Sequence, residues 1–109
     1  PVQVLADVSD EEIARGERTY NTYCTFCHGL VVRSGGAIPD LRRMAQGSLD
    51  AFEEIVLEGL LAGNGMAGFD DVLTTEDLDP LLHYIKTRAH ADREVALGNA
   101  DAARLTWLN

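Results

Sequence analysis

The sequence is poor in cysteine and in basic residues, and it has no long apolar run. It contains two cysteines in 109 residues and 9 basic against 18 acidic residues, a net charge of −9. This acidic balance argues against binding to nucleic acid or to an anionic membrane. No run approaches the ~20 apolar residues that a membrane span needs, and the start lacks a basic region followed by an apolar stretch. We therefore expect one soluble domain, which begins after a removed signal peptide or at a cut within a longer protein.

The sequence also lacks the apolar alternation of β-strands, and its periodicity is helical, which predicts an all-α fold. A capping box at Ser9 predicts a first helix that runs to about residue 23. Ser48 is the expected cap of a second helix. The expected buried stripe of that helix is Leu49, Phe52, Ile55, Val56 and Leu60. Thr74 is the expected cap of a third helix, in which Pro80 should cause a kink or a restart of the helix.

The two cysteines stand together in the stretch Cys24-Thr25-Phe26-Cys27-His28, for which four interpretations compete. A thioredoxin-like motif should follow a strand, and a structural zinc site needs a fourth ligand that only His83 or His90 could supply. A disulfide across so short a spacing would be strained and would leave His28 unexplained. Cys-x-x-Cys-His is also the attachment signature of c-type haem, in which both thiols bind the haem and the histidine binds the iron. The sequence therefore favours haem attachment.

Residues around this motif resemble those of the class I cytochromes c. Gly16, Tyr20 and Cys24 lie on one face of the first predicted helix, and Leu81 and Tyr84 offer a matching apolar face late in the chain. The resemblance implies a class I cytochrome c fold, with three main helices wrapped around one covalently bound haem c. It also implies that the N- and C-terminal helices cross where the glycine allows close approach.

An electron-transfer haem needs a second axial ligand, for which methionine or histidine is usual. We expect Met66, because it lies 38 positions after His28 in a glycine-rich break, far enough for the chain to pass round the haem edge. Met44 is the chief alternative, and a lone methionine is otherwise a core-filling residue. The glycines near Met66 would let the backbone pass close to the macrocycle.

The segment Ile38-Pro39-Asp40-Leu41-Arg42 resembles the class I loop that follows the attachment motif. The resemblance implies that the Pro39 carbonyl accepts a hydrogen bond from the ligand histidine and that Leu41 packs on the haem. Such a bond orients the histidine and makes it a better ligand. Arg42, or else Arg43, is a candidate partner for a haem propionate, because its planar fork matches a carboxylate.

Three longer stretches resemble the C-terminal cytochrome domain of quinohaemoprotein alcohol dehydrogenases. They are residues 34–42, 52–59 and 64–73, and the similarity covers about residues 10 to 90. These periplasmic enzymes oxidise alcohols at pyrroloquinoline quinone on a propeller domain and pass single electrons to a haem c domain. The resemblance implies a periplasmic electron carrier whose donor is a quinone-dependent dehydrogenase, in the same chain or separate. Its acceptor would be a periplasmic carrier or a terminal oxidase.

The expected organisation is an extension or linker over residues 1–8, a cytochrome domain over 9–90 and a tail over 91–109 that is helical or a docking segment. With His28 and Met66 both bound to iron, no position is open for substrate, so the chain alone should not be an enzyme. The alternative is a haem-based sensor or ligand-binding protein whose distal side is open.

Overall fold

Helices form the fold of the described part of the chain. The structure is a computed structural model and describes residues 8–34 and 38–98. In chain order the elements are α1 (Asp10–Tyr23), α2 (Thr25–His28), η1 (Leu30–Val32), η2 (Leu41–Arg43), α3 (Gln46–Asp50), α4 (Phe52–Val56), η3 (Ala62–Asn64) and α5 (Thr75–Ala96). No strand occurs within these described ranges, so the predicted all-α class is confirmed.

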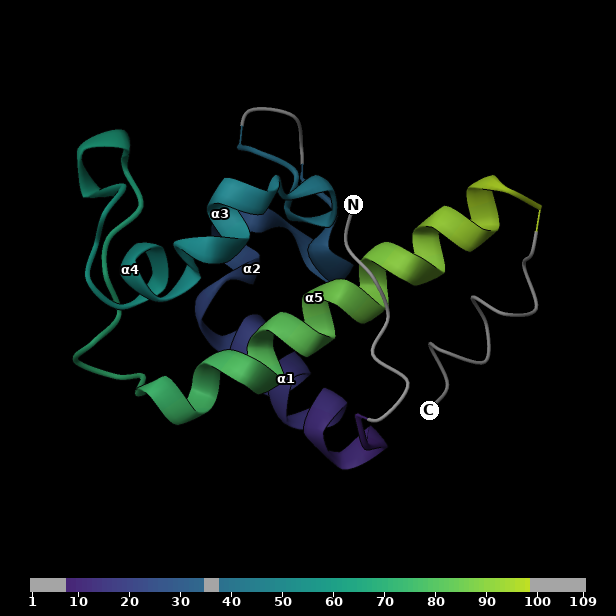
Figure 1. The fold of residues 1–109 in the computed structure, drawn as a ribbon, viewed down its shortest axis with the longest axis horizontal. Helices are drawn as coiled ribbons and strands as arrows, with labels where there is room; N and C mark the ends of the chain where they lie inside the picture. The colour runs from purple at the N-terminus through teal and green to yellow at the C-terminus, as the bar shows by residue number, and fades with distance from the viewer. Residues whose placement is uncertain (1–7, 35–37, 99–109) are drawn as a thin grey trace.

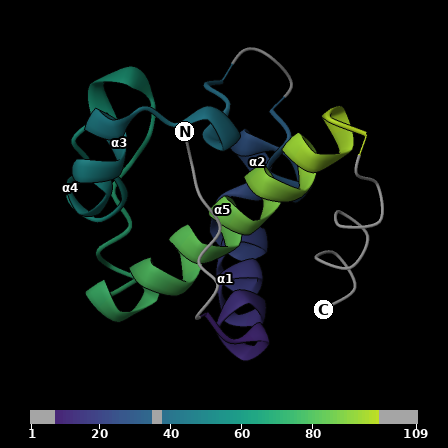
Figure 2. The same ribbon diagram turned by 45° about the vertical axis from the view of Figure 1, so that its right-hand side comes forward.

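The two longest helices, α1 and α5, cross at Gly16, and both views of the ribbon show this crossing (Figures 1 and 2). A β-carbon at position 16 would lie only 1.9 Å from the carbonyl oxygen of Pro80 and 3.0 Å from the β-carbon of Tyr84. One turn further along α1, the Tyr20 and Tyr84 rings pack at 5.4 Å between centroids. Leu81 is buried beside them. The crossing predicted from these residues is therefore confirmed, and it depends on the absence of a side chain at Gly16.

Replacing Gly16 with alanine should lower the free energy of unfolding by about 3 kcal/mol, because the new methyl group must push the two helices apart. Gly47 provides the matched control: it also lies in a helix, but no atom lies within 4 Å of its missing β-carbon. Gly47→Ala should therefore stabilise the protein by up to about 1 kcal/mol through helix propensity. Urea unfolding of the two variants tests this, and equal effects would refute a tight crossing.

Helix α5 runs without interruption through Pro80, so the expected restart of the helix there is wrong. Thr74 is the N-cap, as predicted, and it forms a capping box with Asp77. Pro80 is buried and its carbonyl meets Gly16, so tertiary packing at the crossing compensates for the one helical hydrogen bond that proline cannot donate. The helix also continues to Ala96, so the expected domain boundary at residue 90 falls inside α5. The final residues, 99–109, lie outside the described part.

The second predicted helix is instead two short helices, α3 and α4, which meet at Ala51. Ser48 is not a cap, because α3 begins earlier, with Ala45 as its N-cap. The predicted stripe is only partly buried: Val56 is buried, whereas Leu60 is 60% exposed. Leu60 lies beyond the end of α4 at Val56, so it is not part of a helical stripe. Within the described residues, no helix is long and apolar enough to cross a membrane.

Candidate functional site

The Cys-x-x-Cys-His motif forms a separate helical turn directly after α1. Helix α1 ends at Tyr23, Cys24 joins the two helices, and α2 carries Cys27 and His28. The amides of Cys27 and His28 both donate to the Cys24 carbonyl, at 3.3 and 2.9 Å. These bonds hold the two cysteines and the histidine on one compact turn. The Tyr20 hydroxyl donates to the Gly29 carbonyl at 2.7 Å and so ties the end of this turn back to the helix crossing.

Both thiols are free, so the short spacing between them does not form a disulfide. Cys24 is partly buried, whereas Cys27 is exposed. Burial, with a smaller contribution from Cys27, raises the pKa of the Cys24 thiol to about 11. A thiol with so high a pKa is a poor redox nucleophile, because the thiolate is the attacking form. This environment argues against thioredoxin-like exchange at the motif.

His28 is held in a partly buried position that favours its neutral form. Burial lowers the pKa of the imidazole, and the carbonyl of Pro39 acts in the opposite direction. A neutral imidazole is the form that ligates metals. The Nδ1 atom is buried, and among the described residues it has no hydrogen bond of normal geometry. The Pro39 carbonyl is thus close enough to act on the imidazole, and the bond from His28 to this carbonyl that the family resemblance implies stays a prediction.

Met66 lies in a loop whose base is closed by backbone contacts. The Phe69 amide donates to the Val56 carbonyl at 2.8 Å. A β-carbon on Gly68 would lie 2.5 Å from the Leu57 carbonyl oxygen, so this glycine is needed for the loop to close. The ring of Phe69 packs on that of Tyr23 at 5.9 Å, which joins the loop to the end of α1 beside the motif.

The Met66 side chain is partly buried against the core, and so is that of Met44. The backbone on either side of Met66 is open: no atom lies within 4 Å of a β-carbon at Gly63 or Gly65. Gly65 has a φ of +99°, which itself favours glycine. Gly63 has no such need among the described residues, and its expected role in a close approach of the haem stays a prediction.

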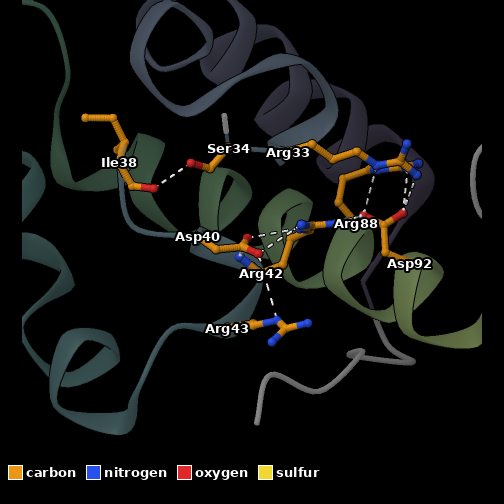
Figure 3. Close-up of polar contacts among 8 residues, drawn as sticks. All are labelled: Arg33, Ser34, Ile38, Asp40, Arg42, Arg43, Arg88 and Asp92. Carbon is orange, nitrogen blue, oxygen red and sulfur yellow. Dashed lines mark hydrogen bonds and ion pairs between the residues drawn. The ribbon is translucent and has the colours of Figure 1, made fainter. Parts of the chain in front are cut away.

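The segment between the motif and α3 is fixed to α5 by a cluster of charged side chains (Figure 3). Arg42 donates to both carboxylate oxygens of Asp40, at 3.0 and 2.9 Å, and to Asp92 Oδ2 at 2.9 Å. These bonds raise the pKa of Arg42 and lower that of Asp40. Arg42 therefore binds two protein carboxylates, and its expected contact with a haem propionate stays a prediction. Arg43 is mostly exposed and lies 3.9 Å from Asp40.

The structure also describes the other residues that the sequence analysis named as candidates. Leu41 is partly buried against the core. His83 bonds Glu12 across the α1–α5 crossing, and His90 pairs with Glu94 at 3.5 Å. These two histidines therefore have carboxylate partners of their own. Because Glu12 bonds His83, only the Ser9 half of the predicted capping box is formed, with the Ser9 hydroxyl accepting from the Glu12 amide at 3.2 Å.

Sequence reasoning missed Asp92, which accepts bonds from three arginines. Arg88 is a local partner four residues earlier on α5, but Arg33 and Arg42 lie 59 and 50 positions away in the chain, so the sequence does not pair them with Asp92. The packing of η1 and η2 on α5 is what brings Arg33 and Arg42 to the Asp92 carboxylate.

The residues present fit a covalently bound haem. The motif supplies two free thiols and an imidazole whose buried Nδ1 has no normal bond among the described residues. Large apolar side chains are left exposed on the segments that follow the motif and precede Met66. They are Leu30, Ile38, Leu60 and Leu61. A flat apolar group would cover such side chains, and its iron would use the imidazole and a thioether.

Comparison with known proteins agrees with this chemistry. Residues 11–85 match the family described as cytochrome c oxidase, cbb3-type, subunit III. The chain is 38% identical over 82 residues to the quinohemoprotein alcohol dehydrogenase ADH IIB of Pseudomonas putida, covering 75% of this chain and 12% of the relative. It is also 32% identical over 87 residues to cytochrome c550 of Pseudomonas aeruginosa, covering 76% of this chain and 59% of that protein.

The structure gives the same result. It superimposes on the solved quinohemoprotein alcohol dehydrogenase ADHIIG of Pseudomonas putida with a TM-score of 0.73 and 29% identity. The match covers 97% of this chain and 15% of the other. The chain thus spans a small part of its dehydrogenase relatives, and its fold is that of their cytochrome portion.

Proposed function

Because the chain belongs to the c-type cytochrome family described as cytochrome c oxidase, cbb3-type, subunit III, we propose that it transfers electrons through one haem c between His28 and Met66. Its donor is a pyrroloquinoline-quinone dehydrogenase. The observation that carries the proposal is the turn α2, where two free thiols and a histidine that favours its neutral form stand side by side. The family carries haem c, and this turn has the groups that attach it.

The two ends of the iron site have distinct roles. The thiols of Cys24 and Cys27 would form the two thioether bonds to the haem, and the imidazole of His28 would be one iron ligand. Met66, on a loop with a closed base, would supply the second iron ligand through its thioether. When bound, the haem exchanges one electron between its ferric and ferrous states. With His28 and Met66 both bound to iron, no position would be open for substrate, so the domain would carry electrons and do no further chemistry.

Electrons enter and leave at the exposed side of α2. Cys27 is exposed there, and the Phe26 side chain beside it is 99% exposed. No Asp, Glu, Lys or Arg occurs between Arg18 and Arg33, so the segment that carries the motif has no such charged side chain of its own in an otherwise acidic chain. Redox partners form small and transient contacts. An uncharged, partly apolar face suits such a contact with a dehydrogenase.

A donor and a compartment follow from the relatives. Several are quinone-dependent alcohol dehydrogenases, in which the matching region is a small part of a longer chain. We infer that the electrons come from such a dehydrogenase, within the same chain or as a separate protein. The compartment is the periplasm, and the acceptor is a periplasmic carrier or a terminal oxidase.

Alcohol-dependent reduction of this haem in the native host tests the proposal. A periplasmic fraction is separated by size, stained for haem and probed with antibody against this chain. Adding a primary alcohol to the fraction should reduce the haem that this antibody captures, and a His28→Ala strain should lose the signal. A band much larger than the chain indicates a donor in the same polypeptide, and a band of its own size indicates a separate donor. A captured haem that alcohol leaves oxidised would refute the donor.

A further inference from the structure

We propose that Asp92 is a positioning residue for the haem site, because it binds Arg33 and Arg42, the two ends of the segment that holds the Pro39 carbonyl near His28. The inference rests on the proposed function, in which His28 is the iron ligand. Asp92 belongs to α5, far along the chain from the motif, and its side chain is 13% exposed.

The Asp92 carboxylate accepts hydrogen bonds from both ends of this segment (Figure 3). At the first end, Arg33 donates to Oδ1 at 3.0 Å and more weakly to Oδ2 at 3.5 Å. At the second end, Arg42 donates to Oδ2 at 2.9 Å. Arg88, one turn earlier on α5, donates to Oδ1 at 3.3 Å. Burial of Asp92 opposes ionisation, but the bonds from Arg33 and Arg42 outweigh it and lower the pKa of the carboxyl.

The Arg42 end connects directly to the backbone next to Pro39. Asp40 follows Pro39 and accepts three bonds from Arg42, two from its guanidinium and one from its amide at 3.0 Å. Asp92 therefore holds Arg42, and Arg42 holds Asp40 and the turn η2 that Asp40 caps. On the other side of Pro39, the Ile38 carbonyl accepts a bond from the Ser34 hydroxyl.

The Arg33 end connects to the histidine itself. A β-carbon at Gly29, directly after His28, would lie 1.9 Å from the Arg33 carbonyl oxygen, so the two backbones are in close contact. Fixing Arg33 to Asp92 therefore also fixes the chain that leaves His28. Since one carboxylate anchors both the ligand side and the acceptor side, it sets the distance between the His28 ring and the Pro39 carbonyl. Outer groups of this kind tune a metal ligand through its second ring nitrogen.

The test measures the His28 ring N–H directly. In reduced, haem-loaded protein labelled with 15N-histidine, exchange of this proton with solvent is followed by NMR in the wild type, Asp92→Asn and Arg33→Gln. Positioning predicts exchange that is faster by about tenfold in Asp92→Asn, with a smaller increase in Arg33→Gln, which breaks one arm only. Asp92→Glu should restore most of the protection.

Two comparisons distinguish a positioning role of Asp92 from a change of net charge and from a general loss of stability. Asp92→Asn and Arg33→Gln change the net charge in opposite directions, so a purely electrostatic effect would shift the reduction potential oppositely and leave exchange unchanged. Arg15→Gln removes a 3.0 Å ion pair to Asp77 that joins α1 and α5 away from this segment. It should lower stability without faster exchange.

Each outcome has a definite meaning. Unchanged exchange in both variants, with only a lower melting temperature, would overturn the positioning role and leave Asp92 as a stabilising residue. A wild-type protein without any protected His28 ring N–H would overturn this inference, because no bond from His28 to Pro39 would then exist to be positioned, and it would leave the proposed function to its own test. Should Asp92→Asn fail to accumulate, Arg33→Gln, whose side chain is 57% exposed, still decides the question.

Discussion

Replacing Met66 with alanine should leave the haem attached, lower its reduction potential and allow carbon monoxide to bind to the reduced protein. The covalent bonds depend on the cysteines and not on Met66, which explains why the haem stays. Loss of the thioether removes the ligand that favours ferrous iron, so the potential should fall by on the order of 0.1 V or more, within the ~0.8 V range that axial ligands set. Spectra with and without carbon monoxide and a potentiometric titration measure both effects.

Met44→Ala is the matched control, because Met44 is also partly buried against the core. It should cost packing energy, about 2 kcal/mol, but leave the spectrum and the response to carbon monoxide unchanged. The opposite result, in which carbon monoxide binds to Met44→Ala but not to Met66→Ala, would identify Met44 as the iron ligand. Binding of carbon monoxide to the reduced wild type would show an open distal side and favour a sensor.

Replacing Cys24 with alanine should cost one of the two thioether bonds and most of the haem-loaded protein. Cys24 joins α1 to α2 and is the more buried thiol of the pair, so its loss removes the attachment nearest the core. The pyridine haemochrome spectrum of any protein that forms should shift to that of a haem with one vinyl group intact.

Cys27→Ala is the companion variant at the exposed thiol, and it should give the same spectral shift. Thr25→Ala lies between the two cysteines and should leave the two-thioether spectrum unchanged. A normal two-thioether spectrum in Cys24→Ala would contradict the attachment chemistry proposed for the motif.

The parts of the fold that the sequence predicted are those controlled by one residue or a short spacing. Gly16 allows a close approach that no other residue permits, so the helix crossing could be predicted from it together with Tyr20 and Tyr84. The capping box at Thr74 is likewise a local pattern. The three-residue spacing of the motif could be interpreted because few chemistries need two thiols and an imidazole within one turn.

The parts that could not be predicted depend on contacts between distant segments. Pro80 was expected to kink its helix or make it restart, and the restart does not occur, because packing against Gly16 overrides the local preference. The prediction of one continuous second helix was wrong, because the chain breaks at Ala51 into α3 and α4, although nothing at that position signals a break. In the ion cluster around Asp92, Arg33 and Arg42 lie 59 and 50 positions from this carboxylate. Charged residues at such separations could not be paired from the sequence.

The most direct test of the account is the mass of one peptide from the protein purified from its native host. Trypsin cuts after Arg18 and Arg33 and releases residues 19–33, which contain both cysteines and His28. The account predicts that this peptide carries the mass of one haem and that neither thiol reacts with an alkylating reagent. Recovery of the unmodified peptide with two reactive thiols would contradict it, because a c-type cytochrome cannot hold its haem without those bonds.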